Sequence, residues 1–129
     1  MFGFFNLLGR GEGLKALDQA FRTFDVHPRI VPEAVKIATV RLMQKASEPT
    51  YKLRDPDYER AAELLSYSIL GPDQFVANTT LVRAELAEQR LEDAIADGDS
   101  LDAELLLLAL NSAIIHPSVA DQFDVESDE

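Results

Sequence analysis

Apolar residues recur along most of the chain at intervals of three and four positions, the spacing that places side chains on one face of an α-helix. In the first such segment the pattern consists of Leu14, Leu17, Ala20, Phe21 and Phe24. Four further segments show the same spacing. The predicted helices are residues 14–24, a segment that begins near residue 32 and ends before residue 45, and residues 55–70, 72–96 and 99–115.

Two of these helices carry more specific expectations. In the fifth, residues 105–110 are apolar on every side, a pattern typical of a helix that is surrounded by protein. We therefore expect the fifth helix to be central and buried. In the second, the expected inner face consists of Ala34, Val35, Ala38, Leu42 and Met43.

Proline, glycine and capping residues mark the ends of the predicted helices. The Asp-Pro-Asp of residues 55–57 opens the third helix, because Asp can cap a helix start and Pro suits its first turn. The Gly-Pro of residues 71–72 ends that helix and begins the next. Residues 78–80, Asn-Thr-Thr, are poor helix formers and predict a kink in the fourth helix. The His-Pro of residues 116–117 stops the fifth, and a short helical turn is expected to follow.

These segments predict an all-α fold, a single-domain bundle of about five helices. No segment shows the alternation of a strand. Residues 1–13 contain several glycines, which disfavour a helix, so we expect an apolar, Gly-rich N-terminal tail there. Residues 14–123 form the expected bundle, and residues 124–129 an acidic, mobile C-terminal end.

Charge is distributed unevenly along the chain, whose net charge is −11. Residues 1–54 hold nine Lys and Arg against five Asp and Glu, whereas residues 55–129 hold three against eighteen. One interpretation is two differently solvated faces of one domain. Another is a surface that repels nucleic acid and attracts basic partners. The two halves could also attract each other, within one chain or between two subunits.

Composition argues against several classes of protein. The chain has no Cys, which excludes disulfides and thiolate sites. No apolar run approaches the roughly 18 residues that a membrane span needs. The first residues lack the basic start and the cleavage site of a signal peptide. We therefore expect a cytoplasmic protein without a membrane span.

No catalytic, metal-binding or cofactor-binding pattern is found. The histidines, His27 and His116, both precede Pro at predicted helix ends, where they are expected to cap the C-terminus of a helix. No Glu-x-x-His or nucleophile motif accompanies them. Glu85, Glu88 and Glu92 share one face of the fourth helix, which favours a solvated acidic surface over a metal site. We therefore predict no catalytic residues, no metal and no cofactor.

The N-terminal segment is the strongest candidate for binding a partner. Its aromatic and leucine side chains are followed by a glycine-rich stretch. They could pack on the open end of the bundle, or they could dock into a groove on a partner protein or a second copy. Nucleic acid is disfavoured as a partner by the net charge. The candidate partner-binding residues are Phe2, Phe4, Phe5, Leu7 and Leu8.

These observations favour a non-enzymatic protein–protein interaction module, self-association included. The alternative is a small helical ligand-binding protein or enzyme with a site between helices. A small-molecule ligand is therefore not excluded as a partner. That alternative needs polar side chains that converge inside the bundle. The candidates are Tyr67, Asn78 and Asn111, and Asn111 is expected to be buried because it interrupts the most apolar helix.

Overall fold

The computed structural model describes the backbone of residues 2–121 and the side chains of residues 11–121. Every regular element in this part of the chain is helical, which confirms the all-α prediction. The helices outnumber the five that were expected. They are α1 (Phe2–Thr23), the 3₁₀ helix η1 (Pro28–Ile30), α2 (Glu33–Ala46), α3 (Asp55–Leu70), α4 (Pro72–Asn78), α5 (Leu81–Ala96) and α6 (Leu101–Asn111).

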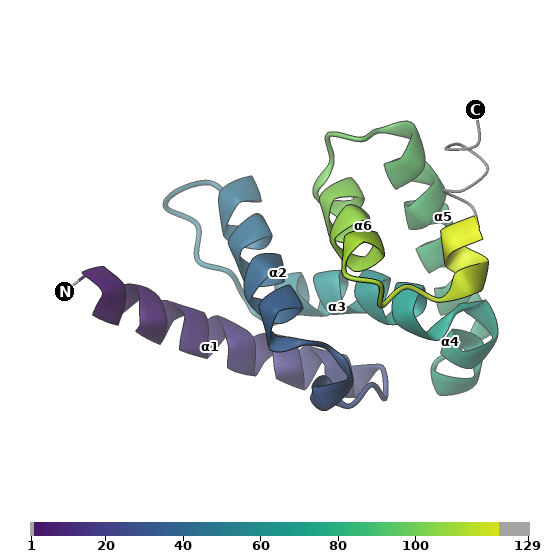
Figure 1. Cartoon of the computed structure of the whole chain (residues 1–129), viewed down its shortest axis with the longest axis horizontal. Coiled ribbons are helices and arrows are strands. Elements are labelled where there is room, and N and C mark those ends of the chain that lie inside the picture. The colour runs from purple at the N-terminus through teal and green to yellow at the C-terminus, as the bar shows by residue number, and fades with distance from the viewer. Residues whose placement is uncertain (1, 122–129) are drawn as a thin grey trace.

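The helices pack in two layers (Figure 1). In one layer α6 lies between α2 and α5, and it contacts both. In the other layer α1 and α3 pack together across these helices, and α4 follows α3 at its end. Because α3 contacts α1, α4, α5 and α6, it joins the two layers.

The most buried helix is α3. Eight of its residues are buried, compared with four in α6. The sides of α6 that face α2, α3 and α5 are covered, but its outer side is open, and Leu107 there is 47% exposed. The expectation that the most apolar helix is fully buried is therefore not confirmed.

The first helix begins at Phe2 and not near residue 14, so its predicted start is too late. The glycines of this segment predict a non-helical tail, but Gly13 has a packing role inside the helix. A Cβ atom at this position would lie 2.9 Å from Val40 Cγ1 and 3.5 Å from the Tyr58 hydroxyl. The missing side chain therefore lets α1 approach α2 and α3 closely.

The segment predicted as one helix over residues 72–96 is two helices, with the break at the predicted kink. Thr79 leaves the helical region, with φ −129° and ψ −105°. The hydroxyl of Thr80 then accepts a hydrogen bond from the Arg83 N–H at 3.1 Å and caps α5. The Asn78 side chain donates to the Phe24 carbonyl at 3.2 Å, which ties the end of α4 to the end of α1.

The last long helix also ends earlier than predicted, at Asn111. Ala113 takes the left-handed conformation, with φ 58°, and the Ile114 N–H donates to the Ala109 carbonyl at 3.2 Å. This is the hydrogen bond of a Schellman motif, which turns the chain out of the helix. The expected short helical turn follows, over residues 117–121.

Replacing Gly13 with Ala tests the close approach of α1. Gly11→Ala is the matched control, because a Cβ atom there meets nothing within 4 Å. Both changes improve helix propensity by roughly 0.5–1 kcal/mol. Only Gly13→Ala crowds the stiff, fully buried Val40, so its free energy of unfolding should be lower than that of the control by about 1–3 kcal/mol. Urea denaturation measures the difference, and equal stabilisation by both changes would contradict this account of Gly13.

Candidate interaction surface

The residues expected to bind a partner lie in two places. Phe2, Phe4, Phe5, Leu7 and Leu8 fall outside the residues whose side chains the structure describes, so their docking role stays a prediction. The three glutamates that were predicted to form an acidic surface lie on α5, and all three are exposed. They are Glu85, Glu88 and Glu92.

The polar side chains that a site between helices would need do not come together. Asn111 is exposed, so the prediction that it is buried is wrong. It lies in the last turn of α6, on the open side of that helix. Tyr67 is fully buried, and its hydroxyl faces Glu88 at 3.5 Å. His116 lies elsewhere, with its ring against Gly71.

The two histidines cap the starts of helices, which corrects the expected C-terminal caps. His27 Nδ1 accepts a hydrogen bond from the Arg29 N–H at 3.1 Å, at the start of η1. His116 Nδ1 accepts from the Ser118 N–H, also at 3.1 Å, at the start of the turn over residues 117–121. Each His-Pro pair therefore begins a helical turn, because the imidazole satisfies an N–H that has no carbonyl partner there.

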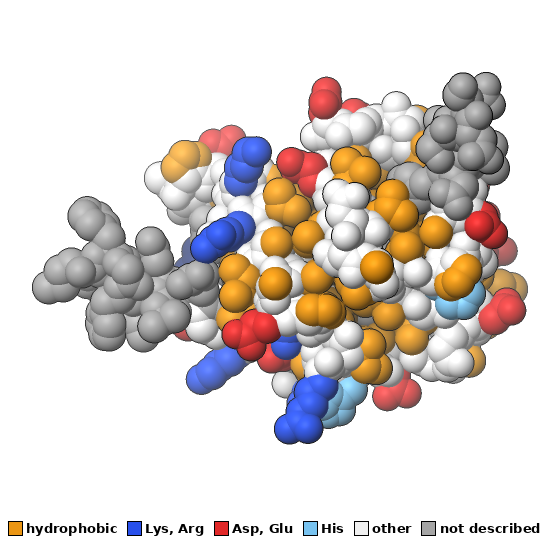
Figure 2. All heavy atoms as spheres, viewed as in Figure 1, with side chains coloured by type: hydrophobic (Ala, Val, Ile, Leu, Met, Phe, Trp, Pro, Cys, Tyr) orange, Lys and Arg blue, Asp and Glu red, His pale blue; other side chains and the backbone are white. Residues whose placement is uncertain are grey.

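A groove runs between α2 and α6 on the face shown in Figure 2. It is shallow and widely open to solvent, with a volume of about 660 Å³. Apolar side chains gather on this face, and the Lys and Arg side chains in view gather on the side of α1 and α2. We call it the α2–α6 groove, and its lining consists of Ala34, Ile37, Ala38, Arg41, Leu42, Lys45 and Leu108.

The groove exists because α2 has a wider apolar stripe than the core can cover. Val35 and Met43 are buried, as the sequence predicted, but Ala34 is exposed and Ala38 and Leu42 are only partly buried. The small side chains of the two alanines leave the floor of the groove hollow. The sequence assigned all of this stripe to the inner face, because core packing and a docking groove require the same spacing.

Two cations lie at one end of the groove. Arg41 and Lys45 are one helical turn apart, and both are exposed. Among the residues that the structure describes, neither forms an ion pair. The apolar lining therefore ends beside two positive charges that are available to a carboxylate.

A second apolar surface lies on α5, and we call it the α5 ridge. It consists of Leu81, Val82 and Leu86, which are 61%, 64% and 62% exposed. The opposite side of α5 packs on the core through small residues and one leucine, which are Ala84, Ala87, Leu91 and Ala94. The helix also carries four exposed carboxylates, which are Glu85, Glu88, Glu92 and Asp93.

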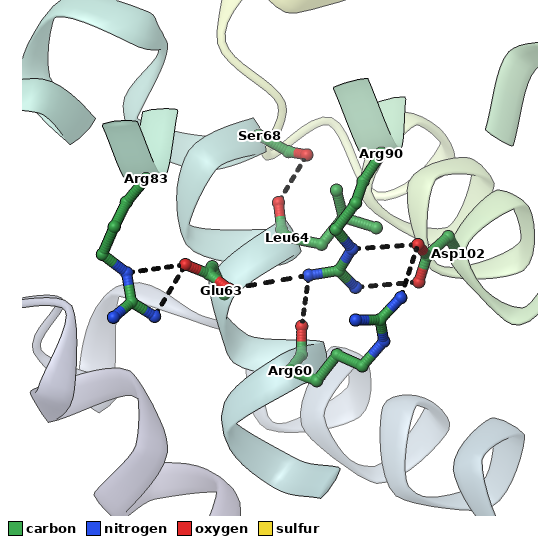
Figure 3. A network of polar contacts seen from close by, with 7 residues as sticks. All are labelled: Arg60, Glu63, Leu64, Ser68, Arg83, Arg90 and Asp102. Atoms are coloured by element: carbon green, nitrogen blue, oxygen red, sulfur yellow. Dashed lines mark hydrogen bonds and ion pairs between the residues drawn. The ribbon is translucent and has the colours of Figure 1, made fainter. Parts of the chain in front are cut away.

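An ion-pair network fixes α5 and α6 against α3 (Figure 3). Arg90 of α5 donates two hydrogen bonds to Asp102 of α6, at 2.9 and 3.0 Å, and a third to the Arg60 carbonyl of α3 at 3.0 Å. Glu63 of α3 accepts from Arg83 of α5 at 2.9 Å and lies 3.8 Å from Arg90. Planar, bidentate pairs of this kind hold their partners at a defined angle.

The network also changes the charge of the surface. Arg60, Arg83 and Arg90 are the three cations of residues 55–129, and all of them face Glu63 or Asp102. The negative charges of the remaining carboxylates of this half, including those on α5, are therefore balanced by few nearby cations.

A further hollow, of about 500 Å³, lies between α1, the end of α2 and the loop that leads to α3. The Tyr51 hydroxyl at its edge donates to Asp57 at 2.7 Å, and this oxygen of Asp57 also accepts the Arg54 N–H. The hydrogen bond from the Arg54 backbone lowers the pKa of Asp57. Burial raises the pKa of Tyr58, which lines the same hollow. The hydrogen bonds of Tyr51 and the Arg54 N–H to Asp57 hold the loop in place.

The described residues offer neither a metal-binding cluster nor a membrane-spanning helix. No group of three or more His, Asp or Glu lies close enough to hold a metal ion there. Nor is any helix in this part of the chain both long and apolar enough to cross a membrane.

Comparison of the chain with protein-family models, with curated proteins and with solved structures gives no match in any of the three. The features of the molecule that bear on its function are therefore the two apolar surfaces and the charges beside them.

Removing Arg90 tests the network that positions these surfaces. In Arg90→Met the apolar part of the side chain stays, but the mostly buried Asp102 loses two charged donors. We expect the free energy of unfolding to fall by about 2–3 kcal/mol. Arg83→Met is the matched control. Because Arg83 is half exposed, its replacement should lower the free energy of unfolding by about 1 kcal/mol at most. Urea denaturation gives both values, and equal losses would mean that the bidentate pair has no special role.

The ionisation of Tyr67 predicts how the stability of the protein depends on pH. Burial and the nearby Glu88 carboxylate raise the pKa of Tyr67 to about 12, from its ordinary value of 10.0. The folded protein therefore holds the phenol proton more tightly than the unfolded chain does. This contribution is complete below about pH 10 and is lost as the pH rises toward about 12, up to roughly 2–3 kcal/mol.

The measurement compares wild type with Tyr67→Phe, which cannot ionise. The difference between their free energies of unfolding should shrink from about pH 9 to about pH 12, because only wild type loses the contribution. A difference that stays constant over this range would show that Tyr67 ionises equally in both states.

Proposed function

We propose that this protein is a non-enzymatic interaction module that uses the α2–α6 groove to bind an amphipathic helix with apolar and acidic side chains. One observation carries the proposal: an apolar groove of about 660 Å³ ends beside Arg41 and Lys45, two exposed cations one turn apart. Helix-in-groove binding uses this combination, with apolar anchors inside and charges at the rim.

The energy of binding would come from the apolar lining. Each leucine-sized side chain that moves from water into the groove contributes roughly 1.5–3 kcal/mol. Ile37, Leu42 and Leu108 provide the contact surface, and the small Ala34 and Ala38 leave room for the incoming side chains. The groove therefore favours a partner that presents large apolar side chains on one face.

The charges would select the partner and its direction. Both cations belong to the C-terminal half of α2, whereas the first part of the groove is apolar. An incoming helix with carboxylates near one end meets them in one orientation only. Such rim charges act mainly on specificity and on the rate of association.

Two further expectations belong to this proposal. The apolar side chains at the start of the chain are proposed as a second docking segment for a partner protein. A cytoplasmic location is also proposed, and the absence of cysteine from the sequence supports it.

The proposal is tested with a pair of synthetic peptides of about 18 residues, long enough to become helical on binding. One carries a leucine stripe flanked by Glu, and the other has Lys in place of every Glu. The Glu peptide should bind wild type at least about tenfold more tightly than the Lys peptide. Fluorescence anisotropy at low salt measures both affinities, and NMR shift changes should lie in the α2–α6 groove.

Reversing the charge of the groove should reverse this preference. The variant with Arg41→Glu and Lys45→Glu should bind the Lys peptide more tightly than the Glu peptide. A variant with Lys15→Glu and Arg22→Glu has the same net charge but leaves the groove intact, because both residues are exposed on α1. If this control loses the Glu peptide to the same extent, the binding depends on net charge and the groove is not the site.

A further inference from the structure

We infer that the helix which fits the α2–α6 groove is α5 of a second copy of this chain, so that copies associate head to tail. The inference rests on the proposed function and names the partner. It begins from the α5 ridge, the most exposed cluster of large apolar side chains in the described part of the molecule.

The α5 ridge has the chemistry that the groove selects. Val82 and Leu86 are one turn apart, and both are more than half exposed. Four exposed carboxylates lie on the same helix: Glu85 stands between Val82 and Leu86 in the sequence, and Glu88, Glu92 and Asp93 follow. Of these, Glu88 also accepts a hydrogen bond from the Tyr67 hydroxyl of α3 at 3.5 Å. A helix with leucine-sized anchors and acidic neighbours therefore already exists in this chain.

The order of the groups matches along both helices. In α2 the apolar positions Ala34 and Ile37 come first, and the cations Arg41 and Lys45 follow. In α5 the apolar ridge lies in the first half of the helix, with Glu85 inside it, and the carboxylates Glu88, Glu92 and Asp93 follow in the second half. With α5 of the second copy parallel to α2, apolar side chains meet the apolar part of the groove and carboxylates meet the cations.

The contact has to form between two copies. Within one molecule α6 separates α5 from α2 (Figure 1), and α5 is held by its buried Ala84, Ala87, Leu91 and Ala94. Its ridge therefore cannot reach the groove of the same molecule unless the domain unfolds. The ion pairs of Arg90 with Asp102 keep the ridge in place for a neighbour.

The groove and the ridge are different surfaces, so the contact is heterologous. Each copy can offer its ridge to one neighbour and accept the ridge of another at the same time. Such contacts produce rings when the rotation closes and open chains when it does not. The mass of the assembly should therefore rise beyond that of a dimer with protein concentration.

Salt should weaken the association, because the cations of α2 and the carboxylates of α5 attract each other through solvent. Charges at an exposed rim are largely screened over about 10 Å at 0.1 M salt. The apolar contacts persist, so high salt should reduce the affinity without abolishing it.

Two variants of the full chain test the two surfaces one at a time. The ridge variant carries Val82→Lys and Leu86→Lys, and the groove variant carries Arg41→Glu and Lys45→Glu. All four residues are exposed, so both variants should fold, which circular dichroism checks. Light scattering after size exclusion at low salt should show assemblies of wild type and monomers of each variant.

The decisive sample is an equimolar mixture of the two variants. The groove variant still has an intact ridge, and the ridge variant still has an intact groove. One contact can therefore form, and the mixture should give a 1:1 complex that does not grow with concentration. The affinity within this complex should match that between wild-type copies within about threefold.

A matched control is Ile30→Lys, which replaces an exposed apolar residue of η1 outside both surfaces. This variant should assemble like wild type. The inference is wrong if wild type is monomeric up to its solubility limit, if the ridge variant alone still assembles, or if the mixture stays monomeric.

These outcomes are distinguishable from failure of the proposed function. Suppose that wild type stays monomeric but its groove still binds the Glu peptide. Then the groove serves a different acidic helix, and only the self-association is overturned. If neither the peptide nor a second copy binds, the proposed function is wrong as well.

Discussion

The burial of α3 is the constraint on which the rest of the structure depends. This helix contacts α1 in its own layer and α5 and α6 in the other. Small residues allow the close packing, among them Ala61 and Ala62 of α3 itself and Gly13 of α1. Because α3 also carries Glu63, which pairs with both arginines of α5, its position determines where the α5 ridge lies.

Helix ends that depend on local chemistry could be predicted from the sequence. α3 begins at Asp55, Gly71 ends it with φ 85°, and the chain breaks at Thr79 and Thr80, as Pro, Gly and capping residues indicate. The predicted cap is wrong in one detail, because Arg54 and not Asp55 is the N-cap, and its N–H donates to Asp57. Features that depend on tertiary contacts could not. Gly13 lies within a helix because another helix approaches it, and no local rule shows that neighbour.

The sequence pattern did not predict the α2–α6 groove, for a related reason. Periodicity identifies the apolar side of a helix, but it does not show how much of that side the rest of the domain covers. On α2, Val35 is buried and Ala34 beside it is exposed, although both belong to the predicted inner face. The same limit applies to α6, where Leu106 is buried and Leu107 is half exposed. Asn111 was expected in the core because its neighbours are apolar, yet it lies on the open side of that helix.

The ion-pair network determines which charges of the uneven sequence remain free on the surface. Arg60, Arg83 and Arg90 are the cations of the acidic half, and Glu63 and Asp102 engage them inside the domain. The carboxylates on the outside of α5 are therefore left without nearby cations from their own half. Two exposed cations that can pair with them, Arg41 and Lys45, are on α2, which lies beyond α6 in the same molecule. An acidic ridge and a basic-rimmed groove that cannot meet within one copy can each be satisfied by a neighbour, and this asymmetry connects the sequence to the proposed assembly.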